Sequence, residues 1–235
     1  MAAAGSGERL GAGRPKAFVP LAGRPMIEWS IDAFRACDSV RSIVVAAPPG
    51  HVGDLVGHPD LGVVSGGATR AESVANGLQA VGTELVAIHD AARPLLTPEL
   101  LEALVARLEE APEAAGAIAA TPVTDTIKQA VAGSGATSDA FSSSEMNNAS
   151  LVIRKTLDRS RLWAAQTPQV FHVEALRAAL AVDPERRDTA TDEAMLVEAA
   201  GGTVLLHPAG PENLKVTTPQ DLRVAELLLA DRSLG

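Results

Sequence analysis

The sequence predicts an α/β domain built around a mostly parallel β-sheet. With 235 residues, 46% of them hydrophobic, the chain fits one large α/β domain or two small ones with an ample core. Short apolar runs alternate with helical patterns along the first half, as in right-handed βαβ units. Polar clusters follow several of these runs, at the strand ends where such sheets bind ligands.

Hydrophobic spacing places the elements of the first half. Pro25 stands at the first position of a helix expected over about residues 24–36. A second helix is expected over about 70–81, and a third opens at Thr97 with an N-cap residue followed by proline. Short apolar runs predict strands at 42–47, 61–64, 84–88 and 114–120.

The second half begins with a change of character. Residues 131–150 are rich in Gly, Ser and Asn, which indicates a loop or an arm rather than core, and order resumes at 151–153. Residues 166–169 are typical of a tight polar turn. The remaining patterns predict helices at 173–181 and 191–199, strands at 203–206 and 213–216, and a last helix after Thr218.

A glycine-rich loop near the beginning of the chain indicates a polyphosphate site. Gly5, Gly7, Gly11 and Gly13 alternate with small residues, and Arg9, Arg14 and Lys16 concentrate positive charge there. Glycine lets the backbone approach a ligand closely, and successive N–H groups can bind an anion. The loop matches neither the Walker A nor the dinucleotide pattern. Taken alone, it is equally compatible with a flexible N-terminal tail.

A phosphate loop of this kind normally follows a buried strand, yet only three residues precede it here. We expect either a first strand shortened to a stub or a true start upstream of Met1, and we favour the second. This strand would occupy the centre of the sheet, and its loss would leave the loop without an anchor.

Composition excludes several classes of protein. The net charge of −9 argues against a nucleic-acid-binding surface. No apolar run reaches the ~18 residues of a membrane span, and residues 1–10 lack an apolar secretory core. Cys37, the single cysteine, permits neither an intrachain disulfide nor a cysteine-based zinc site. A cytoplasmic location is therefore expected.

Residues 89–94 follow the strand expected at 84–88. Asp90 is suited to a ribose hydroxyl or Mg²⁺, although an aspartate at this position also caps turns. Arg93 offers a planar fork for phosphate. His89 is interpreted as a hydrogen-bonded structural group rather than a catalytic base.

Four further places in the chain offer candidate ligand contacts. Gly67 would let a flat base lie against the backbone, and Ser73 could bond its edge, although an ordinary turn explains both residues. Lys215 either points into a phosphate site or protects a sheet edge. Residues 124–126 and 158–161 add hydroxyls and cations.

Seven segments in this order resemble the 2-C-methyl-D-erythritol 4-phosphate cytidylyltransferases. They are AAGSGERLG with PKAF, GGATRAESV, HDAARP, PVTDTIK, DRSRLWAAQTPQVF, TDEAMLVE and NLKVTTPQDL, spanning about residues 2–224. The resemblance implies a Rossmann-like nucleotidyltransferase fold with helices on both faces of a mostly parallel sheet. It implies a single domain, 1–235, with a protruding dimerisation arm at about 128–160.

The resemblance also implies the reaction. CTP and 2-C-methyl-D-erythritol 4-phosphate would give 4-diphosphocytidyl-2-C-methyl-D-erythritol and pyrophosphate, a step of non-mevalonate isoprenoid precursor biosynthesis. Mg²⁺ is expected as the cofactor, held mainly by the CTP phosphates with Asp90 as a candidate ligand. The partners are CTP, a polyol phosphate and a second copy of the chain in a homodimer that exchanges arms.

The resemblance assigns roles residue by residue. Arg9 and Lys16 would neutralise the triphosphate, while Lys215 and Arg159, the latter from the partner's arm, would position the second substrate's phosphate. These four are the expected catalytic residues. The expected nucleotide-binding residues are Ala3, Ala4, Gly5, Gly7, Gly67, Ser73 and Asp90. The expected residues for the second substrate are Arg93, Thr126, Thr167 and Thr191.

One departure from the family is the arm, because the 30 residues between Lys128 and Arg159 exceed the usual length, with the excess near 134–148. The closest alternative function is a cytidylyltransferase for ribitol 5-phosphate or another polyol phosphate. A sugar-phosphate nucleotidyltransferase using UTP or GTP is more distant. An inactive dimeric binding protein is the alternative if the short N-terminus is real.

Overall fold

The computed structural model describes residues 1–5, 7, 10–11, 13–55, 58–132, 151–181, 187 and 189–232. The chain divides into two compact units, described separately below. The first comprises Met1–Ala120 and Ala165–Gly235, and the second is Thr121–Ala164.

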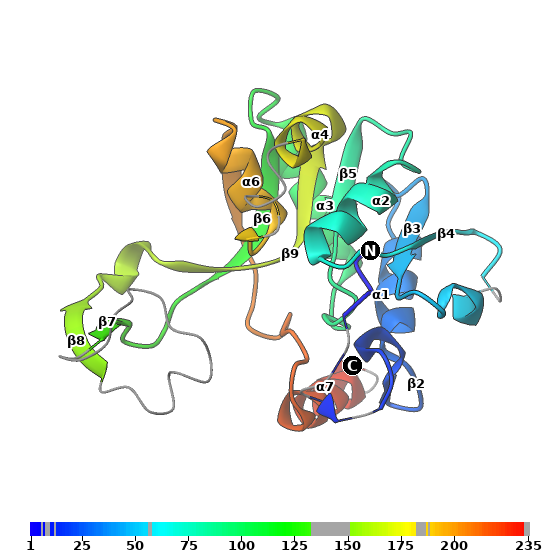
Figure 1. Ribbon diagram of the computed structural model, residues 1–235, viewed down its shortest axis with the longest axis horizontal. Helices are drawn as coiled ribbons and strands as arrows, with labels where there is room; N and C mark the ends of the chain where they lie inside the picture. The colour runs from blue at the N-terminus through cyan, green and yellow to red at the C-terminus, as the bar shows by residue number, and fades with distance from the viewer. Residues whose placement is uncertain are drawn as a thin grey trace. The chain divides into compact units, whose positions relative to one another are not determined.

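The first unit alternates strands and helices (Figure 1). Its helices are α1 (Met26–Arg35), α2 (Arg70–Leu78), α3 (Pro98–Glu109), α4 (Val173–Leu180), α6 (Glu193–Ala199) and α7 (Pro219–Arg232). Its strands are β1 (Pro20–Leu21), β2 (Arg24–Pro25), β3 (Ile43–Ala47), β4 (Leu61–Ser65), β5 (Leu85–Ile88) and β10 (Val204–Pro208), with most of β6 (Gly116–Pro122) and β9 (Trp163–His172). Two short 3₁₀ helices are η2 (Lys16–Phe18) and η3 (Val52–Leu55).

The central sheet is mostly parallel, as the sequence predicted. Strands β3 and β4 form a parallel pair, and a second group has the order β10-β6-β9-β5. Strand β10 is parallel to β6, whereas β9 is antiparallel to β5. The two groups are joined by Ala2, which forms parallel bridges to Ala46 in β3 and to Asp90 just after β5.

The first three residues anchor the glycine-rich loop, contrary to the expectation that it would lack an anchor. The Ala3 N–H donates to the Ala46 carbonyl at 3.0 Å, and the Ala46 N–H donates to the Met1 carbonyl at 3.0 Å. On the other side, the Ala2 N–H donates to the His89 carbonyl at 2.8 Å. Residues 1–3 therefore hydrogen-bond to β3 on one side and to the end of β5 on the other, as a central strand would, just before the loop begins.

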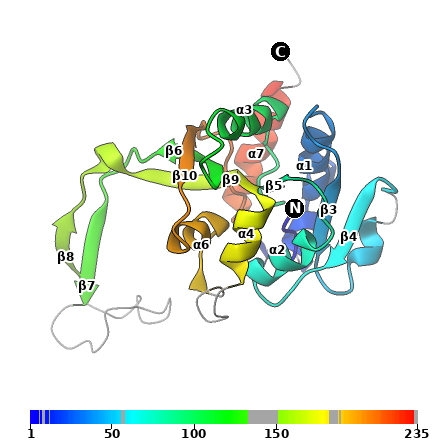
Figure 2. The same cartoon turned by 90° about the horizontal axis from the view of Figure 1, so that it is seen from above.

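Helices cover both faces of the sheet, as Figure 2 shows, with α1 and α3 on one side and α2, α4 and α6 on the other. The first face buries Ile27, Ile31, Leu101, Leu104 and Leu108. The opposite face packs Val74, Leu176 and Val197 against Phe171 of β9. Helix α7 buries Ala225 and Leu229 in a third cluster with Leu21 of β1.

Two local predictions are wrong, and the start of one correctly predicted helix is shifted. Residues 166–169, expected as a polar turn, lie inside β9, where all four are buried and the side chains of Gln166, Thr167 and Gln169 are hydrogen-bonded. Residues 213–216, expected as a strand, have no ladder partner; the Val216 N–H donates instead to the Ala92 carbonyl at 2.8 Å. The first helix begins at Met26 rather than at residue 24, because Arg24–Pro25 pairs with β1 as β2.

The second unit contains an antiparallel pair, β7 (Lys128–Ala132) and β8 (Leu151–Thr156), followed by η4 (Arg159–Arg161). Lys128 Nζ donates to Thr156 Oγ1 at 2.8 Å across this pair. Asp158 caps η4 by accepting from the Ser160 N–H at 3.0 Å. The Ser-rich stretch near 134–148 lies outside the described residues.

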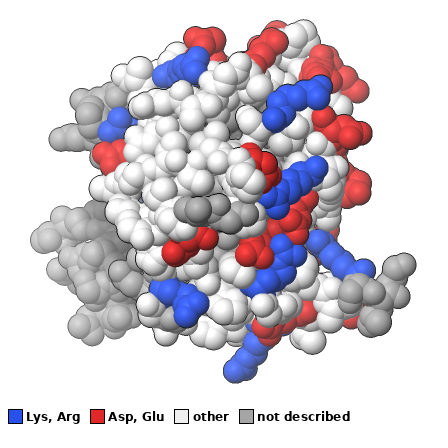
Figure 3. Space-filling view, turned by 90° about the vertical axis from the view of Figure 1, so that its right-hand side faces the viewer, with Lys and Arg blue, Asp and Glu red and all other residues white. Residues whose placement is uncertain are grey.

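Charges of both signs are mixed on the surface. On the face in Figure 3, basic side chains lie beside acidic ones rather than in a continuous basic stripe, among the residues drawn in colour. Two ion pairs at helix α1 show this pattern: Arg24 of β2 pairs with Asp32 of α1 at 2.7 Å, and Arg35 of α1 pairs with Asp60 at 2.7 Å. Within the described part of the chain, none of the helices has both the length and the apolar character needed to cross a membrane.

Candidate active site

A cavity of about 630 Å³ opens beside the beginning of the chain in the first unit. Four segments line it: the glycine-rich loop with Lys16, the turn that opens α2, residues 90–92 after β5, and the segment that carries Lys215 and Thr217. Its volume lies in the range of about 300–1,000 Å³ typical of small-molecule sites. Two of the lining segments follow the carboxyl ends of β4 and β5, so the cavity lies where an α/β sheet is expected to bind its ligand.

The glycine-rich loop folds back so that Lys16 faces the cavity. Gly7 has φ of +75°, and a Cβ atom there would lie 3.0 Å from the Lys16 nitrogen. The Lys16 N–H donates to the Gly5 carbonyl at 3.2 Å, which closes the loop. Glycine is required at position 7 for both the left-handed conformation and the close approach.

The turn from β4 into α2 packs directly against this loop. A Cβ atom on Gly66 would lie 2.6 Å from the Cβ of Ala4, so position 66 must lack a side chain. Thr69 caps α2 by accepting from the Glu72 N–H, and Glu72 accepts in return from the Thr69 N–H. Ser73 Oγ accepts from the Gly67 N–H at 3.1 Å and donates to the Thr69 carbonyl at 2.9 Å.

Asp90 is the ionic centre of the cavity. Its Oδ1 accepts from Arg70 Nε at 3.0 Å, and its Oδ2 lies 2.6 Å from Lys215 Nζ. Burial alone would raise the pKa of Asp90, but Arg70 and Lys215 outweigh it and hold the pKa of this carboxyl well below its usual range. Asp90 is therefore a carboxylate anion that forms ion pairs with both Arg70 and Lys215.

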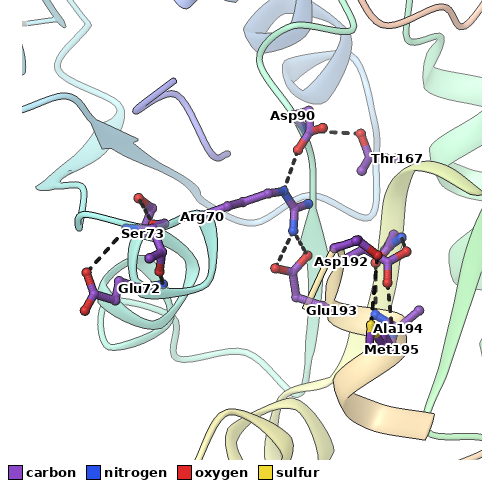
Figure 4. Close-up of polar contacts among 12 residues, drawn as sticks. Arg70, Glu72, Ser73, Asp90, Thr167, Asp192, Glu193, Ala194 and Met195 are labelled. Carbon is purple, nitrogen blue, oxygen red and sulfur yellow. Dashed lines mark hydrogen bonds and ion pairs between the residues drawn. The ribbon is translucent and has the colours of Figure 1, made fainter. Parts of the chain in front are cut away.

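Arg70 bridges Asp90 to a second, deeper carboxylate (Figure 4). Its Nη1 lies 2.5 Å from both oxygens of Glu193, whose side chain is only 1% exposed. Burial raises the pKa of Glu193, while the Arg70 charge opposes that rise. The two carboxylates differ because Asp90 has two cationic partners, whereas the Glu193 carboxylate contacts the guanidinium of Arg70.

Thr167 of β9 holds the backbone at Asp90. Its Oγ1 accepts from the Asp90 N–H at 3.1 Å and lies 3.1 Å from His89 Nδ1. His89 Nε2 lies 3.1 Å from the Arg93 carbonyl, an acceptor, so Nε2 carries the proton and Nδ1 accepts from Thr167. Burial lowers the pKa of His89 to about 3, so the ring is neutral. His89 is thus a structural group, as expected.

Two glutamines of β9 hold the remaining walls. Gln169 Nε2 donates to Asp192 Oδ2 at 2.9 Å, and its Oε1 accepts from the Ala194 N–H at 3.3 Å, which fixes the start of α6. Gln166 Oε1 accepts from Asn213 Nδ2 at 2.8 Å, two residues before Lys215. One strand thus positions the segments that carry Asp90, Glu193 and Lys215.

Residues 1–231 match the family IspD: 2-C-methyl-D-erythritol 4-phosphate cytidylyltransferase. The chain belongs to this family. A relative of that name from Prochlorococcus marinus (strain MIT 9313) is 44% identical over 239 residues, covering 98% of this chain and 97% of the relative. A relative of the same name from Haemophilus influenzae (strain PittGG) is 38% identical over 236 residues, covering 99% and 96%.

A solved structure of the 2-C-methyl-D-erythritol 4-phosphate cytidylyltransferase from Thermus thermophilus has a similar fold. It superimposes with a TM-score of 0.70 at 32% identity, covering 92% of this chain and 94% of that one. The Rossmann-like nucleotidyltransferase fold expected from the sequence is thereby confirmed.

The cavity brings together all seven residues that the cytidylyltransferase resemblance implies bind the nucleotide. Ala3, Ala4, Gly5, Gly7, Gly67, Ser73 and Asp90 all line it, together with Lys16 and Lys215. Arg9 lies outside the described residues. Of the four residues expected to be catalytic, Lys16 and Lys215 therefore lie together in the cavity.

The residues expected to bind the second substrate are more scattered. Arg93 Nη1 donates to the Asn213 carbonyl at 2.7 Å. The Thr167 hydroxyl forms hydrogen bonds with His89 and with the Asp90 N–H. Thr191 is exposed just before α6. Thr126 and Arg159 belong to the second unit, where Arg159 Nη1 donates to the Thr124 carbonyl. Their roles stay predictions.

Arg70 and Glu193 had no role expected from the sequence. Both stand at the first position of a helix, where an acidic residue such as Glu193 is ordinary. An arginine in the first turn opposes the helix dipole, and this was the available signal that Arg70 has a partner elsewhere.

Proposed function

We propose that this chain transfers the cytidylyl group of CTP to 2-C-methyl-D-erythritol 4-phosphate, releasing pyrophosphate, in non-mevalonate isoprenoid precursor biosynthesis. The observation that carries the proposal is the meeting of Lys16, Lys215 and Asp90 in one cavity beneath a glycine-rich loop. Membership of the 2-C-methyl-D-erythritol 4-phosphate cytidylyltransferase family supports the choice of substrates.

The reaction needs positioning and charge stabilisation rather than a base. A phosphate oxygen of the polyol phosphate attacks the α-phosphorus of CTP, a new P–O bond forms, and the bond to the β-phosphate breaks to release pyrophosphate. The nucleophile is already anionic, so no proton has to be removed. His89 fits this scheme, since both its nitrogens are hydrogen-bonded and burial lowers its pKa to about 3.

The chain's own groups divide between the two substrates. The glycine-rich loop and Lys16 face the triphosphate, where N–H groups and an ammonium stabilise the charge that builds on the α-phosphate. Gly67 and Ser73 contact the cytosine and its ribose, and Asp90 lies near the ribose. Lys215, which lines the same cavity from a different segment of the chain, orients the attacking phosphate.

Mg²⁺ is the proposed cofactor, and the residues fit a metal that arrives with the nucleotide. No group of three or more His, Cys, Asp or Glu side chains suited to a metal occurs within the described ranges. Asp90 nevertheless presents a carboxylate oxygen to the cavity, and hard cations prefer such oxygens. When bound mainly by the CTP phosphates, Mg²⁺ would neutralise their charge, with Asp90 as its protein ligand.

We also propose that the active form is a homodimer that exchanges arms, so that Arg159 of the partner subunit contributes to the cavity. A cytoplasmic location is proposed as well. Strand β8 of the second unit exposes Leu151, Val152 and Ile153, at 45, 51 and 61%. Such an apolar strand favours a protein interface. Sedimentation of the Ile153→Lys variant tests this, since a monomer is expected if the strand is in the interface.

Pyrophosphate release with CTP and Mg²⁺ tests the catalytic proposal. We expect release with 2-C-methyl-D-erythritol 4-phosphate and none with ribitol 5-phosphate. Release with ribitol 5-phosphate alone would overturn the assigned substrate but keep the cytidylyl transfer. The absence of release with both, for a protein that is folded by circular dichroism and binds no CTP in calorimetry, would refute the proposal.

A further inference from the structure

Two buried carboxylates share one guanidinium at the edge of the cavity. Arg70 Nε contacts Asp90 Oδ1 at 3.0 Å, and Arg70 Nη1 contacts both oxygens of Glu193 at 2.5 Å (Figure 4). Arg70 and Asp90 line the cavity, whereas Glu193 lies behind them with 1% of its side chain exposed. Glu193 can therefore reach a ligand only through Arg70.

We propose that Glu193 is a positioning residue for the nucleotide, acting through Arg70 on Asp90. By holding Nη1, Glu193 turns the guanidinium so that a single nitrogen, Nε, meets Asp90 at Oδ1. The second carboxylate oxygen, Oδ2, is then left for the cavity, where it contacts Lys215 at 2.6 Å. Asp90 thus presents one oxygen in a fixed direction.

Without Glu193, Arg70 could bind Asp90 in a different geometry. An arginine facing an aspartate tends to bind it through two parallel N–H···O bonds that occupy both oxygens. Without an anchor at Nη1, Arg70 would be free to turn and take Oδ2 as well. That oxygen would be lost to Lys215 and to any ligand in the cavity.

Glu193 itself is rigidly placed. Asp192 caps α6 by accepting from the Met195 N–H at 3.0 Å, and Gln169 bonds both Asp192 and the Ala194 N–H. These bonds do not involve the Glu193 side chain, so α6 keeps its start when that side chain is replaced. The Glu193→Gln variant should therefore fold.

Glutamine cannot replace glutamate at this position. Arg70 Nη1 lies within hydrogen-bond distance of both Glu193 oxygens, so an amide nitrogen in place of one oxygen sets donor against donor. The variant also removes the negative charge that anchors the guanidinium. Glu193→Asp keeps the charge on a shorter side chain and should restore part of the function.

The inference rests on the proposed function. A double-mutant cycle tests it, with CTP binding measured by calorimetry and turnover by steady-state kinetics. The variants are Glu193→Gln, Arg70→Gln and the double variant, with Glu198→Gln as a matched control because Glu198 is exposed on the same helix. We expect Glu193→Gln to raise the Kd and KM for CTP about tenfold, with kcat changed much less. Glu193→Asp should recover part of the loss, and the control variant should bind CTP as the wild type does.

The cycle separates positioning from a general structural role. In the Arg70→Gln background Glu193 has no guanidinium to orient, so Glu193→Gln should change CTP binding less than twofold. A tenfold loss in both backgrounds would overturn the proposal, as would an unchanged Kd in the wild-type background. If Glu193→Gln fails to fold, the same comparison is made with Glu193→Ala, which also removes the charge that anchors Arg70, and an unchanged Kd for CTP in that variant overturns the proposal. A wild-type protein that does not bind CTP would refute the proposed function instead.

Discussion

The ammonium of Lys215 lies 2.6 Å from Asp90 Oδ2, although the two residues are 125 positions apart and Lys215 belongs to no helix or strand. The segment of Lys215 is held by Asn213, which donates to Gln166 Oε1 at 2.8 Å and to the Thr167 carbonyl at 2.9 Å. The charge of Lys215 is therefore delivered to the cavity by a network anchored on β9.

Replacing Lys215 by alanine should lower kcat/KM for the polyol phosphate by about 10² to 10³, because one charge that positions the attacking phosphate is removed. Pyrophosphate release at saturating CTP measures this. Arg223→Ala, an exposed cation on α7, is the matched control and should retain activity. A Lys215→Ala enzyme within threefold of the wild type would show that this ion pair has no catalytic use.

Lys16→Ala should reduce kcat by about 10² to 10³, the typical cost of losing one group that stabilises transition-state charge. Lys16 faces the cavity at the end of the glycine-rich loop, and its backbone closes that loop through Gly5. Because alanine keeps the backbone N–H, the loop should survive and the loss should fall on turnover. Arg107→Ala on α3 is the control for an exposed cation. Near-normal turnover would remove Lys16 from the mechanism.

Thr167→Val should destabilise the protein by about 1–3 kcal/mol in urea unfolding, since it leaves His89 Nδ1 and the Asp90 N–H unpaired in the core. Valine has nearly the same shape, so packing changes little. Thr167→Ser keeps the hydroxyl and should restore most of the stability. Equal stability of the valine and serine variants would contradict the structural role of this hydroxyl.

The sequence predicted elements that local signals define. Thr97 caps α3 as expected, with Pro98 at the first position, because capping and proline effects act within one turn. Strand β9 escaped prediction because its centre, residues 166–169, is polar and contains a proline. Those side chains are buried only because they bond to segments far away in the chain, which no local pattern reveals.

The candidate site was predictable in the same uneven way. Lys16 and Asp90 stand beside glycines or strand ends that mark ligand sites, so chemistry and position agreed in the sequence. The Arg70–Glu193 pair joins residues 123 positions apart, and each has an ordinary explanation at the start of its helix. Lys215 was expected inside a strand because Leu214 and Val216 flank it, yet its backbone is held by Ala92 and by the network at Asn213.

His89 should make the stability of the protein depend on pH. Burial lowers its pKa to about 3 in the folded protein, against an unfolded value of about 6.5. Between these values the unfolded state binds more protons, so the free energy of unfolding rises with pH. The contribution of His89 is complete above pH 6.5 and falls by up to about 1.4 kcal/mol per pH unit below it.

The His89→Asn variant removes this titration. At pH 7.5 it should be less stable than the wild type by about 1–3 kcal/mol, because the bonds to Thr167 and the Arg93 carbonyl are disturbed. As the pH falls from 6.5 to 5, the wild type loses stability through His89 and the variant does not, so the difference should shrink. Urea unfolding at several pH values measures it, with His207→Asn as the control for replacing a histidine. A difference that stays constant from pH 7.5 to 5 would mean that His89 is protonated as readily in the folded protein as in the unfolded chain.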